Sequence, residues 1–458
     1  MTKITHALIL AFTLLAAPVA GAEQPVAAIA EAPQQTGGGV DTQRFPPPDF
    51  DTGYGLPLTT IPAPRAELLM FLDMALLLLA LSLAAYLALR VRSRKGLFAL
   101  MIFSLAYFGF YREGCICPIG AIQNMTLAIF ESGYAAPLVV IYFFVLPLAF
   151  TLFFGRAFCA AVCPLGAIQD LALVRPVNLP VWVDNALGLL AYAYLGAAVL
   201  FAAMGSAYII CEYDPFVAFF RLSGSFNMIV VGISFLLISL FIGRPYCRFF
   251  CPYGVLLRWM SRFSRWRVTV TPDDCIQCKL CEESCPFGAL DPATLQEAPA
   301  PGGSDRKRLA IMLVLAPLLV VGGALVGSSL GAPFSKMHHQ VLLAERIQLE
   351  EAGLAEGVTE ASKAFRDSAG SVTALIQEAV DIREGFATGS WLLGAFLGLV
   401  VAGRLLRLSV FRRRQDYEAN RAGCYACGRC FATCPIELER RKPGGAAAVG
   451  IDLQEHRR

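Results

Sequence analysis

Two stretches of this chain share one cysteine spacing: CIQCKLCEESCP at residues 275–286 and CYACGRCFATCP at residues 424–435. Each follows the pattern Cys-x2-Cys-x2-Cys-x3-Cys-Pro. Thiolates are soft, strongly donating ligands, and these short gaps let one loop supply three of them to a single iron–sulfur cube. A pair of structural zinc sites is the alternative, but zinc seldom uses four cysteines in so short a run. The spacing therefore predicts two [4Fe–4S] clusters.

The fourth cysteine of each run is expected to serve the other cluster, as in bacterial ferredoxins with two such runs. The predicted ligands are Cys275, Cys278, Cys281 and Cys434 for one cluster, and Cys424, Cys427, Cys430 and Cys285 for the other. Pro286 and Pro435 come directly after the fourth cysteines, where a residue without an N–H turns the chain. The two runs therefore predict one ferredoxin-like module that is split in the sequence.

The composition indicates that this module belongs to a membrane protein. Of the 458 residues, 56% are hydrophobic and only 16% are charged, whereas soluble domains contain about 25% charged residues. The net charge of +3 is too small to indicate a nucleic-acid partner. We therefore expect membrane lipid, and no nucleic acid, around this chain.

The N-terminal region predicts export of the segment that comes after it. Residues 1–22 have the features of a secretory signal peptide: Lys3, an apolar run, and Ala20-Gly21-Ala22 as a cleavage site. An uncleaved anchor helix is the alternative. Residues 23–66 are rich in Pro, Gly, Gln and Ala and predict a flexible periplasmic arm.

Seven apolar stretches are candidate transmembrane helices, because most of them approach the ~20 residues that a helix needs to cross ~30 Å of hydrocarbon. They are residues 67–89, 97–111, 136–154, 184–207, 226–242, 309–330 and 391–410. The stretch 97–111 is short, and a re-entrant segment is its alternative.

The positive charges decide the expected orientation. They form four clusters, which run from Arg90 to Lys95, from Arg258 to Arg267, from Arg306 to Arg308 and from Arg412 to Arg414. Seven alternating spans put all four clusters on the cytoplasmic face, whereas a re-entrant 97–111 puts three of them outside. We therefore predict a multi-pass α-helical protein of the bacterial inner membrane, with both cysteine runs on the cytoplasmic side.

This topology also predicts the domain organisation. The parts are a membrane domain at 67–257, one ferredoxin half at 258–305, a membrane hairpin at 306–411 and the other ferredoxin half at 412–458. The hairpin carries a periplasmic segment at 332–390, which we expect to be helical and broken near Gly357 and Gly370.

An internal repeat lies in the membrane domain: GRAFCAAVCPLG at 155–166 and GRPYCRFFCPYG at 243–254. The cysteines of each copy lie about one helical turn apart and share a helix face. The four are Cys159, Cys163, Cys247 and Cys251. If the two faces meet, they form a four-thiolate cage for a further metal or cluster, or a redox-active dithiol. The alternative is that small apolar cysteines pack the helix ends.

A degenerate third copy of the repeat reads CICPIGAIQ at 115–123. Its Cys115 and Cys117 come after the second span and Cys211 comes after the fourth, so we expect these three cysteines near the external face. These cysteines have three possible roles: a redox or metal relay, a disulfide that leaves one thiol free, or packing alone.

Three further residues are candidates. His338 and His339 lie just outside the sixth span and predict either haem or copper ligation or a polar helix face. Asp73 lies within the first span and predicts either a proton or quinol site or an acid solvated at the membrane interface.

With these motifs, the chain resembles the NosR/NapH family of membrane iron–sulfur proteins, which combine several spans, two Cys-x3-Cys-Pro motifs and two ferredoxin-type runs. The resemblance covers roughly residues 67–290 and 391–440. It implies that the paired motifs and the ferredoxin cysteines named above are the site residues. Two features depart from the family: residues 23–65 are too short for a flavin domain, and a membrane hairpin separates the two runs.

The resemblance implies electron transfer between the quinone pool or cytoplasmic donors and a periplasmic reductase or electron carrier. Such a chain is an electron-transfer subunit, with a quinol dehydrogenase component as one form. A factor that reduces and delivers copper, or that matures a reductase, is the alternative function.

Overall fold

The computed structural model describes residues 66–114, 117–131, 133–270, 275–294, 303–355, 357–368, 370–409, 414 and 416–440. The predicted signal peptide, residues 23–65 of the predicted arm and Cys115 lie outside these residues.

Helices dominate the part of the chain that the structure describes, and a helix lies at each of the seven apolar stretches. These are α2 (Glu67–Tyr86) with its π-helical continuation η1 (Leu87–Val91), α3 (Arg94–Ser104) with its π-helical continuation η2 (Leu105–Tyr111), α5 (Leu138–Phe154), α8 (Val181–Ala203), α11 (Phe226–Ser239), α15 (Gly303–Ser335) and α18 (Val372–Leu408). Four segments are long and apolar enough to cross a bilayer: Glu67–Val91, Val181–Ala203, Lys307–Ser335 and Val372–Leu408. Because α5 and α11 have only 17 and 14 residues, they fall below that length.

Short helices begin at the proline of each Cys-Pro motif of the three repeat copies. A cysteine is the N-cap and a proline the first helical residue of α4 (Pro118–Phe130), α7 (Pro164–Ala172) and α13 (Pro252–Arg262). Proline suits this position because the first helical N–H has no partner within the helix and the ring presets φ. The other short helices are α6 (Ala157–Ala161) and α12 (Pro245–Phe249), which carry the first cysteine of each pair, and α9 (Ile209–Tyr213) and α10 (Val217–Arg221), which join α8 to α11.

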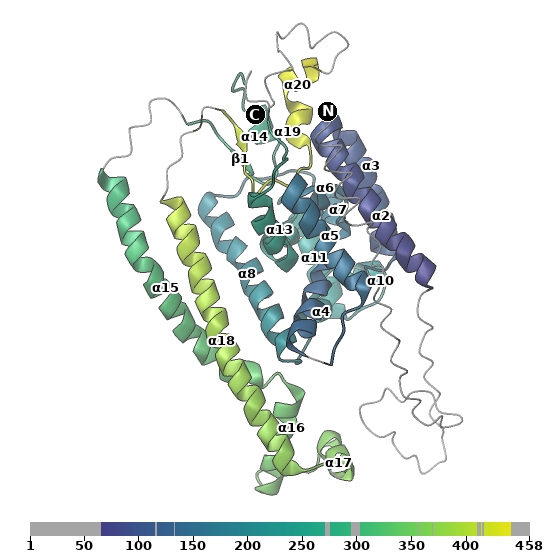
Figure 1. The fold of residues 1–458 in the computed structure, drawn as a ribbon, viewed down its shortest axis with the longest axis vertical. Coiled ribbons are helices and arrows are strands. Elements are labelled where there is room, and N and C mark those ends of the chain that lie inside the picture. The colour runs from purple at the N-terminus through teal and green to yellow at the C-terminus, as the bar shows by residue number, and fades with distance from the viewer. Residues whose placement is uncertain are drawn as a thin grey trace, which may run out of the picture.

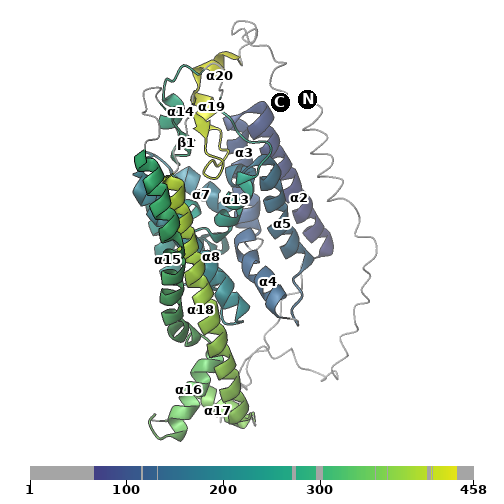
Figure 2. The ribbon, with the colours of Figure 1, turned by 60° about the vertical axis from the view of Figure 1, so that its left-hand side comes forward.

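The two ferredoxin runs form one small module. The first run and the residues after it form α14 (Leu280–Glu283) and β1 (Leu290–Asp291), and the second run and its flanking residues form β2 (Glu418–Ala419), α19 (Arg429–Thr433) and α20 (Pro435–Arg440). The two strands pair antiparallel with Leu290 opposite Ala419, and α14 packs on α19. Figures 1 and 2 show this module at the end of the helical bundle where α15 begins and α18 ends. The hairpin of α15 and α18 therefore returns the chain to the same end.

The segment between α15 and α18 lies at the opposite end of the molecule (Figure 1). It contains α16 (His339–Glu351) and α17 (Glu360–Asp367). Glu350 of α16 accepts hydrogen bonds from Ser362 and Arg366 of α17, which hold the two helices together. The 37 residues of α18 form one continuous helix, so the last part of the predicted external segment and the last apolar stretch belong to the same helix.

Glycines let α15 and α18 approach closely along their length. A Cβ atom at Gly327 would overlap the carbonyl oxygen of Ser390, and one at Gly394 would overlap that of Gly323. Small residues four positions apart are typical of helix pairs that pack backbone against backbone in membranes. These glycines therefore allow α15 and α18 to pack backbone against backbone.

We expect Gly327→Val to separate these two helices. The added side chain has no space against Ser390, so the variant should lose about 1–3 kcal/mol of stability, the usual cost of overpacking. Gly322→Val is the matched control, because a Cβ atom at Gly322 meets no heavy atom within 4 Å. Unfolding of both purified variants in mild detergent checks the prediction, and equal stabilities would contradict it.

Candidate metal centres

The first ferredoxin cavity is lined by Cys275, Cys278 and Cys281 of the first run and by Cys434 of the second. It encloses about 360 Å³ free of protein atoms, and Val270 and Tyr417 complete its apolar wall. Three cysteines of one run thus face a fourth that lies more than 150 residues further along the chain.

The second ferredoxin cavity reverses this arrangement. It is lined by Cys424, Cys427 and Cys430 of the second run and by Cys285 of the first. Its volume of about 370 Å³ is nearly that of the first cavity, and its wall is also largely apolar. Both cavities have a donor set of four cysteines, which indicates the same kind of occupant.

The loops around both cavities have the same backbone shape. Gln277 and Lys279 of the first run have positive φ values of 53° and 64°, and the equivalent Ala426 and Gly428 have 53° and 78°. Left-handed residues curl the loop so that successive cysteines face inward. A non-glycine residue in this region costs of order 1 kcal/mol, and such strain concentrates at functional sites.

Burial opposes free thiolates in these cavities. It raises the pKa of Cys281 to about 11 and that of Cys424 to about 12. A buried thiolate is stable only beside compensating positive charge, and iron supplies it. The donor chemistry, the loop shape and the matching volumes therefore fit iron–sulfur clusters.

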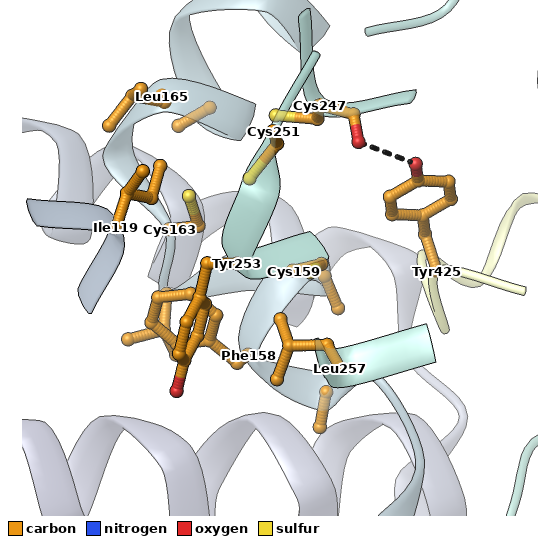
Figure 3. Close-up of a cluster of buried hydrophobic side chains, with 14 of the residues drawn as sticks. Ile119, Phe158, Cys159, Cys163, Leu165, Cys247, Cys251, Tyr253, Leu257 and Tyr425 are labelled. Carbon is orange, nitrogen blue, oxygen red and sulfur yellow. Dashed lines mark hydrogen bonds between the residues drawn. The ribbon is translucent and has the colours of Figure 1, made fainter. Parts of the chain in front are cut away.

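A third cavity lies among the membrane helices, and we name it the membrane cavity. It encloses about 520 Å³, and five cysteines line it: Cys117, Cys159, Cys163, Cys247 and Cys251. Figure 3 shows Cys163, Cys247 and Cys251 facing one another across the two copies of the repeat. The two copies of the repeat therefore meet, and the cysteines of both copies line one cavity.

Cys117 lies in a different place from the one that its position in the sequence predicts. We expected it near the external face, but it lines the membrane cavity with the paired cysteines. The physical reason is the turn after η2, where Glu113 and Gly114 have positive φ values of 52° and 62° and redirect the chain. The structure thus brings Cys117 to the paired cysteines, which the sequence had not grouped with it, and its role as an external relay stays a prediction.

Cys211 is exposed on α9 and lies beside the first turn of α4. A Cβ atom at Gly120 would lie 3.2 Å from its Sγ atom. Since Cys117 is the N-cap of that same helix, the exposed cysteine and the membrane cavity are separated by one helical turn. Among the residues that the structure describes, no three His, Cys, Asp or Glu side chains converge closely enough to bind a single metal ion.

Two arginines that precede the cysteine pairs in the repeat are buried at the membrane cavity. Arg156 and Arg244 are each 1% exposed and line it. Arg156 donates to the Sγ of Cys159 at 3.7 Å and to the carbonyl oxygen of Ala422 at 3.3 Å. Arg244 donates to the carbonyl oxygen of Cys159, and Gly166 makes room for it, because a Cβ atom there would lie 3.0 Å from its Nη1. The repeated Gly-Arg dipeptide was the sequence signal for these residues.

Asp170 of α7 joins the repeat to the ferredoxin module. Its carboxylate is fully buried and pairs with Arg94 at 3.0 Å, Arg429 at 3.2 Å and Arg244 at 3.4 Å. Burial alone would raise the pKa of Asp170, but the three guanidinium groups hold it well below its usual range. Arg429 lies between two cysteines of the second run, so the ion pairs tie that run to the membrane helices. The sequence contains no pattern that would have identified Asp170.

Tyr425 forms the wall between the second ferredoxin cavity and the membrane cavity. It lines the ferredoxin cavity, and its hydroxyl donates to the carbonyl oxygen of Cys247 at 3.3 Å (Figure 3). On the other side, the guanidinium of Arg156 lies 4.0 Å from the centre of the Tyr425 ring. Tyr425 therefore lies between the second ferredoxin cavity and two residues of the membrane cavity, Arg156 and Cys247.

The remaining candidates have structural partners. Asp73 is completely buried, accepts from the Tyr107 hydroxyl at 2.7 Å and pairs with Arg112 at 3.0 Å. Solvation at the interface is therefore the wrong interpretation of this acid. His338 is buried as the N-cap of α16, where its Nδ1 accepts from the Gln340 N–H at 3.2 Å, and its ring stacks on His339.

Comparison with known families finds iron–sulfur domains in the same places. Residues 136–180 and 225–271, which contain the two Cys-x3-Cys-Pro copies, match a family model described as a 4Fe-4S binding domain. Residues 268–291, which contain the first ferredoxin run, match another model with that description. No solved structure matches the chain.

Curated relatives are similar over part of the chain. The uncharacterized protein MJ0750 of Methanocaldococcus jannaschii is 32% identical over 190 residues, which are 40% of this chain and 77% of the relative. The putative electron transport protein YccM of Escherichia coli is 28% identical over 190 residues, 37% of this chain and 52% of YccM. Protein NirI of Paracoccus denitrificans is 31% identical over 124 residues, 26% of this chain and 18% of NirI. With the apolar helices and the cysteine cavities, these matches show that the chain belongs to the NosR/NapH-like family of membrane iron–sulfur proteins, which transfer electrons through 4Fe-4S domains.

Proposed function

We propose that this protein carries electrons through the bacterial inner membrane, between the quinone pool or a cytoplasmic donor and a periplasmic reductase or electron carrier. The two ferredoxin cavities hold [4Fe–4S] clusters, each ligated by three cysteines of one run and the fourth of the other. The membrane cavity holds a further redox centre.

The observation that carries this proposal is the single wall between the second ferredoxin cavity and the membrane cavity. Tyr425 lines the second ferredoxin cavity, and it contacts two residues that line the membrane cavity: its hydroxyl donates to the carbonyl oxygen of Cys247, and its ring packs on the Arg156 guanidinium. Cys424, Cys427, Cys430 and Cys285 would hold the cluster of the second ferredoxin cavity, which would exchange single electrons with a centre in the membrane cavity without breaking a bond or moving a proton.

The contacts of the first basic cluster support a cytoplasmic location for the ferredoxin module. Arg92 pairs with Glu437 at 2.9 Å, and Arg94 donates to the carbonyl oxygen of Cys427 at 3.0 Å. Basic residues at the end of a membrane helix favour the cytoplasmic side. In this orientation α16 and α17 lie on the periplasmic side, where they offer a docking site to the partner.

The outward route requires intermediate centres, because a hydrocarbon layer of ~30 Å is too thick for one efficient tunnelling step. The membrane cavity is the first of these. Cys211, exposed beside the helix that Cys117 caps, supports an exit from this cavity towards the outer side.

Electron flow into sealed vesicles tests the proposal. The protein is reconstituted in liposomes that enclose ferricyanide, and a membrane-impermeant reduced viologen is added outside. We expect the intact protein to reduce the enclosed ferricyanide, and Cys278→Ala and Cys427→Ala to slow this at least about tenfold, since each variant loses a cluster.

Lys336→Gln is the control, since Lys336 is exposed near α16, at the end away from the ferredoxin module. Iron analysis establishes that the clusters are absent from the cysteine variants. Unchanged ferricyanide reduction by variants that have lost their clusters would overturn the proposal.

A further inference from the structure

The three copies of the repeat have one element in common, the sequence Cys-Pro-x-Gly. The third copy lacks the first cysteine of the pairs, since Glu113 stands at that position. Each copy nevertheless brings its Cys-Pro cysteine to the membrane cavity: Cys117, Cys163 and Cys251. The cysteine of the Cys-Pro dipeptide is therefore the one that all three copies place at the cavity.

These three cysteines are N-caps of three different helices. The helices α4, α7 and α13 have 13, 9 and 11 residues, and their first turns converge on the cavity. The Sγ atom of Cys251 accepts from the Gly254 N–H at 3.2 Å. The positive end of a helix dipole stabilises a thiolate at this position. Three such ends around one cavity favour a negatively charged occupant.

Arg156 independently indicates the same charge. Its guanidinium is buried at the cavity, and its hydrogen bonds among the described residues go to the Sγ atom of Cys159 and the carbonyl oxygen of Ala422, not to a carboxylate. Its Nε atom has no hydrogen-bond partner either. A buried cation without a counter-ion is strongly unfavourable, so the missing negative charge is expected in the cavity. Thiolates that ligate an iron–sulfur cluster provide this charge beside Cys159.

We infer that the membrane cavity holds a third iron–sulfur cluster and that Cys117, Cys163 and Cys251 are ligands of it. The fourth ligand is one of the first-position cysteines, Cys159 or Cys247. A cube takes thiolates from several directions, which agrees with a cavity that five cysteines from separate helix ends line. The inference rests on the proposed function only in treating this cavity as a redox centre.

Iron and acid-labile sulfide analysis tests this in protein that lacks the two ferredoxin clusters. In the Cys278→Ala, Cys427→Ala double variant we expect about four irons and four sulfides per chain to remain, the content of one cube. Adding Cys117→Ala should remove these irons or change the EPR spectrum of the reduced centre. Adding Cys211→Ala, which replaces a cysteine outside the cavity, should change neither.

A double variant without iron would overturn the inference, and so would stoichiometric copper in its place or a Cys117→Ala protein with unchanged iron and EPR spectrum. If the double variant fails to fold, EPR of the full protein replaces it, with three cluster signals expected and only two contradicting the inference. The vesicle assay is a separate measurement: electron flow that depends on Cys278 and Cys427 upholds the proposed function even when the membrane cavity contains no cluster.

Discussion

Replacing Cys434 with alanine is expected to remove the cluster of the first run, not the cluster of its own run. Cys434 lines the first ferredoxin cavity with Cys275, Cys278 and Cys281. Without this thiolate one iron of the cube has no protein ligand in an otherwise apolar pocket. The variant should therefore lose about four irons and one EPR signal.

Double variants show which cluster has been lost. Cys434→Ala combined with Cys278→Ala should lose no more iron than either variant alone, because both cysteines line the same cavity. Cys434→Ala combined with Cys427→Ala should lose about eight irons, since both clusters are affected. Cys285→Ala should add no iron loss to Cys427→Ala, because both cysteines line the second ferredoxin cavity. Combined with Cys278→Ala, it should lose about eight irons. Additive losses in the first combination would disprove the exchange of ligands between the runs.

Asp170→Asn is expected to be the most destabilising single substitution outside the cysteines. The carboxylate is the shared counter-ion of Arg94, Arg244 and Arg429, and Arg244 is 1% exposed. Removing one partner of a buried ion pair leaves an uncompensated charge and costs about 3–5 kcal/mol. Because Arg429 belongs to the second run, the ferredoxin module should also loosen from the membrane helices.

Unfolding in mild detergent measures the stability of this variant, and hydrogen exchange of the backbone amides in α19 measures the loosening. Glu345→Gln is the control, because its partners Lys336 and Arg383 are about half exposed and surface pairs contribute at most about 1 kcal/mol. Equal stability of the two variants, with α19 equally protected, would show that Asp170 does not hold the module in place.

The cysteine spacing alone predicted much of the ferredoxin module, because its ligands lie on short loops whose geometry is local. Positions 277 and 279 adopt the same left-handed conformation as 426 and 428, so equal spacing corresponds to equal loop shape. The apolar stretches likewise predicted the helices, since the length and hydrophobicity of a segment are properties of its own residues. Four of these segments are long and apolar enough to cross a bilayer, and the number of spans is still a prediction.

The position of Cys117 could not be predicted in this way. The sequence places it after an outward-running helix, but the turn through Glu113 and Gly114 directs it into the membrane cavity. Backbone conformation at two residues thus decided which cysteines share a site. Spacing along the chain contains no information about a turn of this kind.

The amino-acid sequence by itself determined the cysteine runs, the repeated Cys-Pro motifs and the membrane character of the protein, because all three depend on neighbours in the chain. Only the tertiary structure decided which cavity each cysteine faces and which charges meet at Asp170. The groups around that carboxylate come from residues 94, 244 and 429, and packing of separate helices brings them together. Tyr425 likewise lies between two cavities only because the α15 and α18 hairpin returns the second run to the membrane helices.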